Sequence, residues 1–133
     1  MKRMTGILVA AMLTLAVTQG MAKEATHAGH AGHMQMAGAQ KTVTGEVVDL
    51  GCYMGHDARG AKHISCATKC IDQGMPMGLL TSNGTIYLLT LNHEDADPYN
   101  QLKKMAGKNV SVSGTVMTKG GMKAIDVTAV KAS

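Results

Sequence analysis

Residues 110–130, VSVSGTVMTKGGMKAIDVTAV, decide the fold class of this chain. The first half alternates small or β-branched apolar residues with polar ones, which is the period of a strand that buries one face. A Lys-Gly-Gly turn at 119–121 then reverses the chain. In the returning half, Ile125, Val127 and Ala129 are spaced by two, so we expect all three to face the core. The stretch predicts a β-hairpin.

Three further strands are expected upstream of this hairpin. Residues 42–50 (TVTGEVVDL), 79–81 and 85–91 are short runs rich in β-branched and aliphatic residues. Residues 82–84, Ser-Asn-Gly, join the last two runs, and Asn-Gly between apolar runs is the strongest short-range hairpin signal.

A short helix is expected between the third and fourth strands. Asp97 is its predicted N-cap, Pro98 falls in the first turn and Gly107 lies just past the end. Every third residue is apolar, which gives the helix one buried face. The residues expected on that face are Tyr99, Leu102 and Met105.

Five short strands with one helix between the third and fourth are typical of the OB-fold. We therefore predict a mainly β protein, a small five-stranded OB-like Greek-key barrel with a Cys-rich helical insertion at 51–78, after the first strand. The alternative is another small antiparallel barrel or sandwich built from the same strands.

Residues 1–22 have the pattern of a secretory signal peptide. A basic start at Lys2 and Arg3 precedes an apolar run at 7–17, and small residues flank a cleavage point after Ala22. The apolar run is shorter than the roughly twenty residues that a spanning helix needs. We expect a periplasmic or secreted monomer that has no membrane association after cleavage.

The composition excludes some classes of function. The chain has 13 Lys and Arg against 9 Asp and Glu, and two of the basic residues fall in the predicted signal. It has three Tyr and neither Phe nor Trp, so the aromatic platforms of a single-strand nucleic-acid binder are missing. No nucleophile–base pair, phosphate loop or dinucleotide fingerprint is present. We assign no catalytic residue and expect a binding protein.

Residues 23–40 consist largely of Ala, Gly, His and Met without an apolar period, which predicts a disordered tail before the domain at 41–133. Histidines at every third position share one side of a polyproline II helix. Imidazole and thioether donors suit copper. We interpret the tail as a weak metal-collecting arm, with a solvated linker as the alternative. Its candidate ligands are His27, His30, His33, Met34 and Met36.

All three cysteines lie in the insertion. A helix is expected at 63–74, and on it His63, Cys66 and Cys70 share one face. Cys52 closely follows the first strand, and the barrel is expected to hold it near the same helix. These four side chains are predicted to form a Cys3His metal site, which is a recognised zinc set, and thiolates also suit Cu(I). Copper is the favoured ion and zinc the alternative. Reserve ligands are His56, Met54, Met75 and Met77.

A disulfide is the competing interpretation of the insertion. An oxidising compartment favours disulfides, and three cysteines leave one thiol over. Cys52 bridged to Cys66 or Cys70, or those two bridged along the helix, would give a stapled module without metal that binds a periplasmic protein. A thiol redox protein that uses the spare cysteine is a third interpretation, although no C-x-x-C motif is present.

Four runs in this chain resemble a group of small exported bacterial proteins with an OB-like domain. The runs are GEVVDLGCY (45–53), HISCATKCIDQGMPMGLLT (63–81), KNVSVSGTV (108–116) and AIDV (124–127). The group shares a Cys, then His-x-x-Cys-Ala-x-x-Cys, then Gly-x-Pro. The resemblance covers roughly residues 42–130 and implies the barrel fold. It also implies that Cys52, His63, Cys66 and Cys70 are important, and it leaves the biochemical role open.

Overall fold

The computed structural model describes residues 38–133. Its elements are β1 (Ala39–Asp49), α1 (Leu50–His56), a 3-10 helix (Ala61–His63), α2 (Ile64–Asp72), β2 (Met77–Leu80), β3 (Ile86–Leu91), α3 (Asp97–Lys103), β4 (Asn109–Lys119) and β5 (Met122–Ala132). The predicted signal peptide and the tail ligands His27, His30, His33, Met34 and Met36 lie outside the described residues. Among residues 38–133, no helix combines the length and apolar character needed to cross a membrane.

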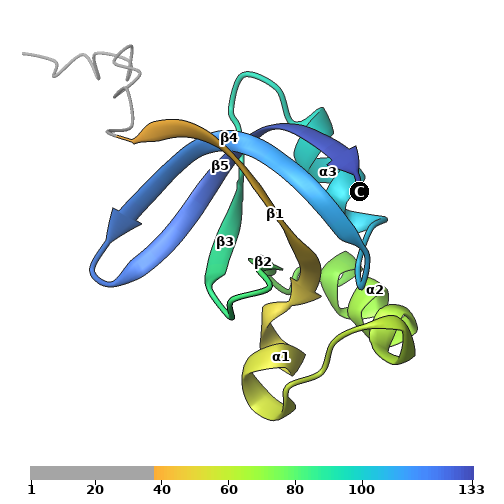
Figure 1. Cartoon of the computed structure of the whole chain (residues 1–133). Coiled ribbons are helices and arrows are strands. Elements are labelled where there is room, and N and C mark those ends of the chain that lie inside the picture. Colours follow the sequence, from red (N-terminus) through yellow and green to blue (C-terminus); the bar gives the residue numbers. More distant parts are fainter. Residues whose placement is uncertain (1–37) are drawn as a thin grey trace, which may run out of the picture. The chain divides into compact units, whose positions relative to one another are not determined.

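The five strands close into a barrel in the order β1-β2-β3-β5-β4, and β4 pairs back onto β1 (Figure 1). The prediction of a mainly β, five-stranded barrel is therefore confirmed. Four of the strand pairs are antiparallel, whereas β3 and β5 run parallel. The barrel is thus mixed, because the chain crosses over through α3 and β4 before β5 joins β3.

The β4–β5 hairpin turns at Gly120 and Gly121, whose φ angles of 59° and 82° favour glycine. Its register shifts between Ser113 and Gly114, where the pairing passes from Ala129 to Val127. The shift is a β-bulge, and it reverses the alternation of β5 beyond that point. Ala129 is consequently exposed, so its predicted position on the core face was wrong.

The barrel interior is filled by aliphatic side chains from every strand. Leu102 of α3 is fully buried against this core, and Tyr99 and Met105 pack beside it, as the helix period predicted. The predicted N-cap was wrong, because Asp97 is the first residue of α3 and Ala96 precedes it as the cap. Asp95 lies two residues earlier and accepts a hydrogen bond from the backbone N–H of Asp97 at 3.0 Å.

Two short helices lie together at one end of the barrel, where β1 ends (Figure 1). The first of them, α1, continues directly from β1, and no helix was predicted there. The second, α2, begins at Ile64 and ends at Asp72, inside the predicted range of 63–74. Its Ala67 and Ile71 are buried in the barrel core, so the opposite face of α2 is free to carry other side chains.

Candidate metal centre

The site begins at Asp49, the last residue of β1. This residue is fully buried, and its Oδ1 accepts a hydrogen bond of 2.8 Å from the backbone N–H of Gly51. Asp49 thereby caps α1 and fixes the direction in which the helix leaves the strand. Cys52, in the first turn of α1, is held over the end of the barrel as a result. The second oxygen, Oδ2, is buried without a hydrogen-bond partner in the described part of the chain.

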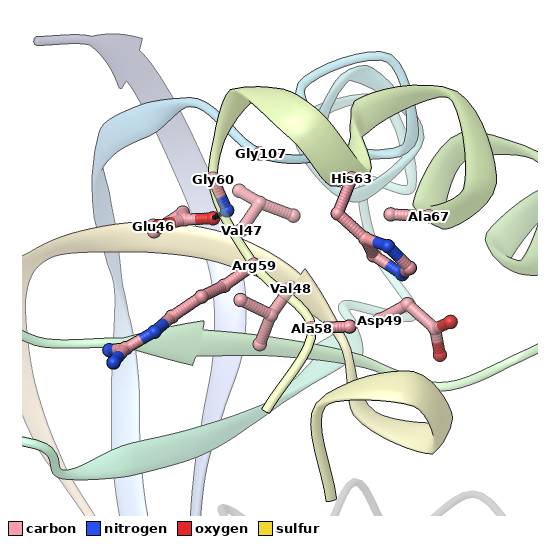
Figure 2. A pocket seen from close by; sticks show the side chains of 10 residues that line it. All are labelled: Glu46, Val47, Val48, Asp49, Ala58, Arg59, Gly60, His63, Ala67 and Gly107. Carbon is pink, nitrogen blue, oxygen red and sulfur yellow. Dashed lines mark hydrogen bonds between the residues drawn. The ribbon is translucent and has the colours of Figure 1, made fainter. Parts of the chain in front are cut away.

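His63 is positioned by the loop that precedes α2. Its backbone N–H donates to the carbonyl of Gly60 at 2.9 Å, and the N–H of Gly60 donates to the Glu46 carboxylate of β1. Figure 2 shows the imidazole aimed across the end of β1 toward Asp49. The ring atom Nε2 is buried, and no hydrogen-bond partner for it exists within residues 38–133. A buried polar atom of this kind needs a partner.

Helix α2 supplies the two remaining sulfur atoms from the side next to its buried residues Ala67 and Ile71. Cys66 is exposed and Cys70 is half-buried. Their spacing of four residues places both on one side of the helix. The carbonyl of Cys70 accepts hydrogen bonds from the backbone N–H groups of Gln73 and Met75. These bonds end α2 about one turn after Cys70.

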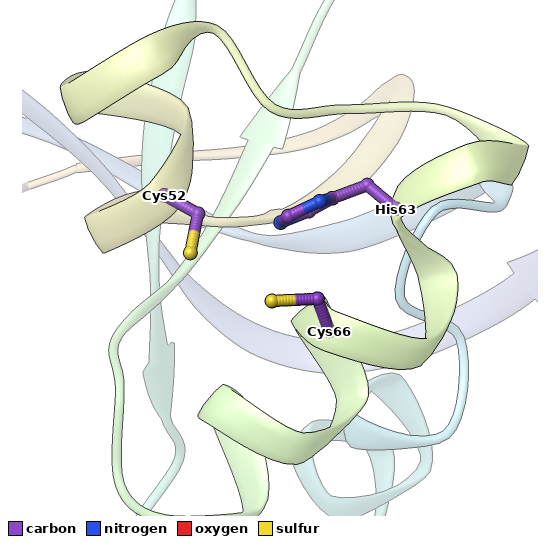
Figure 3. Close-up of side chains that lie close together, drawn as sticks. All are labelled: Cys52, His63 and Cys66. Carbon is purple, nitrogen blue, oxygen red and sulfur yellow. The ribbon is translucent and has the colours of Figure 1, made fainter.

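These side chains converge as two triads that share Cys52. The donor atoms of Cys52, His63 and Cys66 lie within 4.8 Å of one another, and Figure 3 shows the three side chains pointing together. The donor atoms of Asp49, Cys52 and Cys70 satisfy the same limit. All three cysteines are free thiols. The four predicted ligands thus gather at one place and could hold a metal ion, with Asp49 added.

The thiols of Cys52 and Cys70 are held protonated in the metal-free protein. Interaction with the Asp49 carboxylate, followed by burial, raises the pKa of Cys52 from 9.0 to about 12. Burial is also the largest cause that raises the pKa of Cys70. Because metals bind the thiolate, an incoming ion must displace these protons, and binding must strengthen as pH rises.

The reserve ligands lie at different distances from this centre. His56 is exposed at the end of α1, and its ring centroid lies 6.5 Å from that of His63. Met75 is half-exposed beside the position of Gly51, while Met54 is largely exposed on α1. Met77 is fully buried among the aliphatic side chains of the barrel, where it fills the core.

Sequence reasoning missed Asp49, because it ends an apolar strand and was counted with that strand. A signal was nevertheless present. An Asp between a strand and the residues Leu50 and Gly51 is a helix N-cap pattern, and the following turn contains the first cysteine. The capping carboxylate lies at the start of the helix, and the cysteine is in the first turn. The two side chains are therefore near each other.

Comparison of the chain with protein-family models, with curated proteins and with solved structures finds no match. The functional argument therefore rests on the geometry of the site.

Proposed function

We propose that this protein binds a soft or borderline transition-metal ion through Cys52, His63 and Cys66, with Cys70 completing the donor set. The buried and unpartnered Nε2 of His63 is the observation that carries the proposal. A ring nitrogen of His63 and the sulfur atoms of Cys52 and Cys66 lie within 4.8 Å of one another, so these three donors are close enough to share one ion. A metal ion among them supplies the partner that the ring lacks.

The donor spacing fits a metal ion after a small contraction. Metal–sulfur bonds of about 2.3 Å place two sulfur ligands of one tetrahedral ion about 3.8 Å apart. The donor atoms observed here lie within 4.8 Å of one another, and rotation of the side chains closes the remaining difference. One nitrogen and two thiolates suit Cu(I), and Cys70 as a fourth ligand suits Zn(II). We take copper as the leading ion and zinc as the second.

The proposal also assigns the chain a place and a fold family. The signal-like residues 1–22 support export to the periplasm or beyond, and the shared motifs support kinship with the small exported bacterial OB-like proteins. The barrel with a helix between β3 and β4 is consistent with an OB-like architecture. The segment before β1 acts as a weak collecting arm through His27, His30, His33, Met34 and Met36. The folded domain then holds the ion more tightly than the arm does.

Substitution of His63 tests the proposal most directly. His63→Ala removes the only nitrogen of the set and should weaken Cu(I) or Zn(II) binding at least about tenfold. Affinity is measured anaerobically on reduced full-length protein by competition with a chromophoric chelator. His93→Ala, which changes an exposed histidine in the turn after β3, is the matched control and should leave affinity unchanged. Full affinity in His63→Ala would rule out this donor set.

The same arrangement of sulfur atoms also favours a second function, that of a disulfide-stapled module without metal that binds a protein partner. The sulfur of Cys52 lies within 4.8 Å of those of both Cys66 and Cys70, so oxidation could join it to either after a rotamer change. A thiol count on freshly purified, unreduced protein separates the two functions. Bound metal and three reactive thiols after chelation support the metal site. One reactive thiol and no metal support the staple.

A further inference from the structure

We infer that the centre has a second metal position, made by Asp49, Cys52 and Cys70, and that the thiolate of Cys52 bridges two ions. The inference rests on the proposed function, since the first position is the one that contains His63. The geometry points to it because the donor atoms form two compact triads that meet at one sulfur. A thiolate sulfur has enough lone pairs to bind two ions at once.

Asp49 is the strongest indication of the second position. Its side chain is fully buried, and Oδ1 is already engaged by the N–H of Gly51. Oδ2 is buried without a hydrogen bond of ordinary geometry in the described residues, and the thiol of Cys52, a weak donor, lies beside the carboxylate. The only ion pair between described residues joins Arg59 to Asp57, so no cationic side chain there neutralises Asp49. A buried carboxylate without a partner is costly, and a cation beside Oδ2 removes the cost.

The chemistry of the second triad selects its ion. One carboxylate oxygen and two thiolates suit Zn(II), which accepts both donor types, better than they suit Cu(I). Charge balance agrees with this choice. Three thiolates and one carboxylate carry four negative charges. Zn(II) at both positions balances them, and Cu(I) at the first with Zn(II) at the second leaves one, whereas a single divalent ion leaves two charges in a half-buried cluster. The second position therefore takes a divalent ion of zinc type.

Cobalt(II) titration followed by electron paramagnetic resonance tests the inference, with Co(II) as the spectroscopic substitute for Zn(II). The protein is the reduced full-length chain carrying His27→Ala, His30→Ala and His33→Ala, so that the tail adds no imidazole ligands. Two ions should bind per chain. The signal of the first ion should fall as the second binds, because a bridging thiolate couples their spins. Zn(II) alone should reach the same stoichiometry by elemental analysis.

Single substitutions in that background should show which ligand holds which ion. Asp49→Asn keeps the cap of α1, since Asn caps helices about as well as Asp, but should weaken the second ion at least about tenfold. Cys70→Ser should do the same by an independent route. His63→Ala should remove the other ion, and Cys52→Ser should remove both. Asp57→Asn, at an exposed carboxylate, is the control and should retain two coupled ions.

The other outcomes separate this inference from the proposed function. One ion per chain, weakened by all four ligand substitutions alike, would overturn the second position and leave a mononuclear site. Two ions whose signals simply add would overturn the bridge. Two coupled ions in Asp49→Asn at unchanged affinity would exclude Asp49. Failure of Co(II), Zn(II) and Cu(I) alike to bind would overturn both proposals together.

Discussion

The two carboxylate oxygens of Asp49 have different roles. Oδ1 caps α1, and Oδ2 is buried without a hydrogen-bond partner in the described residues, while the carboxylate as a whole lies beside the sulfur atoms of Cys52 and Cys70. Without a metal, the carboxylate disfavours the negative thiolate of Cys52 and keeps the thiol protonated. With a metal, the same charge attracts the ion. One residue therefore protects the empty site from oxidation, since the thiol is less reactive than the thiolate, and strengthens the filled site.

Asp49→Asn should lower the pKa of Cys52 from about 12 toward the ordinary value of 9.0. Asparagine keeps the cap and removes the charge, so the largest cause of the shift weakens. Titration of thiolate ultraviolet absorbance in metal-free, reduced protein measures the change. The midpoint of the Cys52 thiol should fall, whereas Asp57→Asn should leave it in place.

The direction of the stability change follows from the same shift. The folded chain holds the Cys52 proton more tightly than the unfolded chain does, because the pKa is raised on folding. This contribution is fully present below pH 9 and is lost as pH rises through about 12. Urea unfolding of the metal-free protein should show less loss over that interval in Asp49→Asn. An equal loss in both proteins would show that Asp49 does not set the pKa.

At the scale of elements, the position of α2 depends on a glycine far from it in sequence. Gly107 follows α3 in a left-handed conformation, and a Cβ atom there would lie 2.5 Å from a side-chain carbon of Ile64, the first residue of α2. The N–H of Gly107 also donates to the carbonyl of Val47 in β1 at 2.7 Å. The absence of a side chain thus lets α2 approach β1 closely enough for its sulfur atoms to meet Cys52.

Gly107→Ala should therefore weaken metal binding although it changes no ligand. Gly84→Ala is the matched control, because Gly84 has a similar positive φ and open space around the missing Cβ. Both should lose about 1–2 kcal/mol of stability from left-handed strain. Only Gly107→Ala should lose a further ~1–3 kcal/mol from overpacking and shift α2. Urea unfolding and chelator competition measure the two effects, and equal metal affinity in both variants would contradict this role of Gly107.

Strands and their turns were the elements most open to prediction. The alternation at 110–117 and the Asn-Gly turn at 83–84 are local signals, and β4, β2 and β3 lie where those signals placed them, within a few residues. The bulge at Thr128 was not predictable, because it comes from the pairing of β5 with β4 rather than from β5 itself. Helix α1 was missed for a different reason: Gly51 and Gly55 give it a low intrinsic helix propensity.

The candidate site was predictable in residue type but not in arrangement. Helical spacing alone placed His63, Cys66 and Cys70 on one face, and the structure brings Cys52 to them. The division into two triads depends on how far α1 and α2 stand apart. That distance is set by the packing of both helices against β1, which no local pattern encodes.

For the molecule as a whole, a metal ion would connect three elements that otherwise meet through few contacts. The donor residues come from the end of β1, from α1, and from the 3-10 helix (Ala61–His63) that runs directly into α2, together with α2 itself. An ion that binds only the folded chain stabilises it by about 2.7 kcal/mol when its free concentration is a hundred times the Kd. In a domain of this size, that shift raises the melting temperature by about 10 °C or more.

Thermal unfolding of reduced protein, with Zn(II) or Cu(I) and then with a strong chelator, measures this stabilisation. The chelator should lower the melting temperature of the natural sequence and leave that of Cys52→Ser unchanged, since this variant lacks the shared ligand. Identical melting temperatures with and without metal in the natural sequence would mean that no ion binds the folded domain.

The donor residues of the metal centre lie close together in the sequence, whereas closure of the barrel pairs strands that are far apart in the sequence. All five fall between residues 49 and 70, but β1 and β4 pair residues as far apart in sequence as Ala39 and Val116. Contacts of short sequence separation form sooner than distant strand pairings. An ion present during folding would therefore meet its ligands early and order the segment between β1 and β2 before the barrel closes. The metal would then be part of the folding nucleus, so its supply would set how quickly the chain folds.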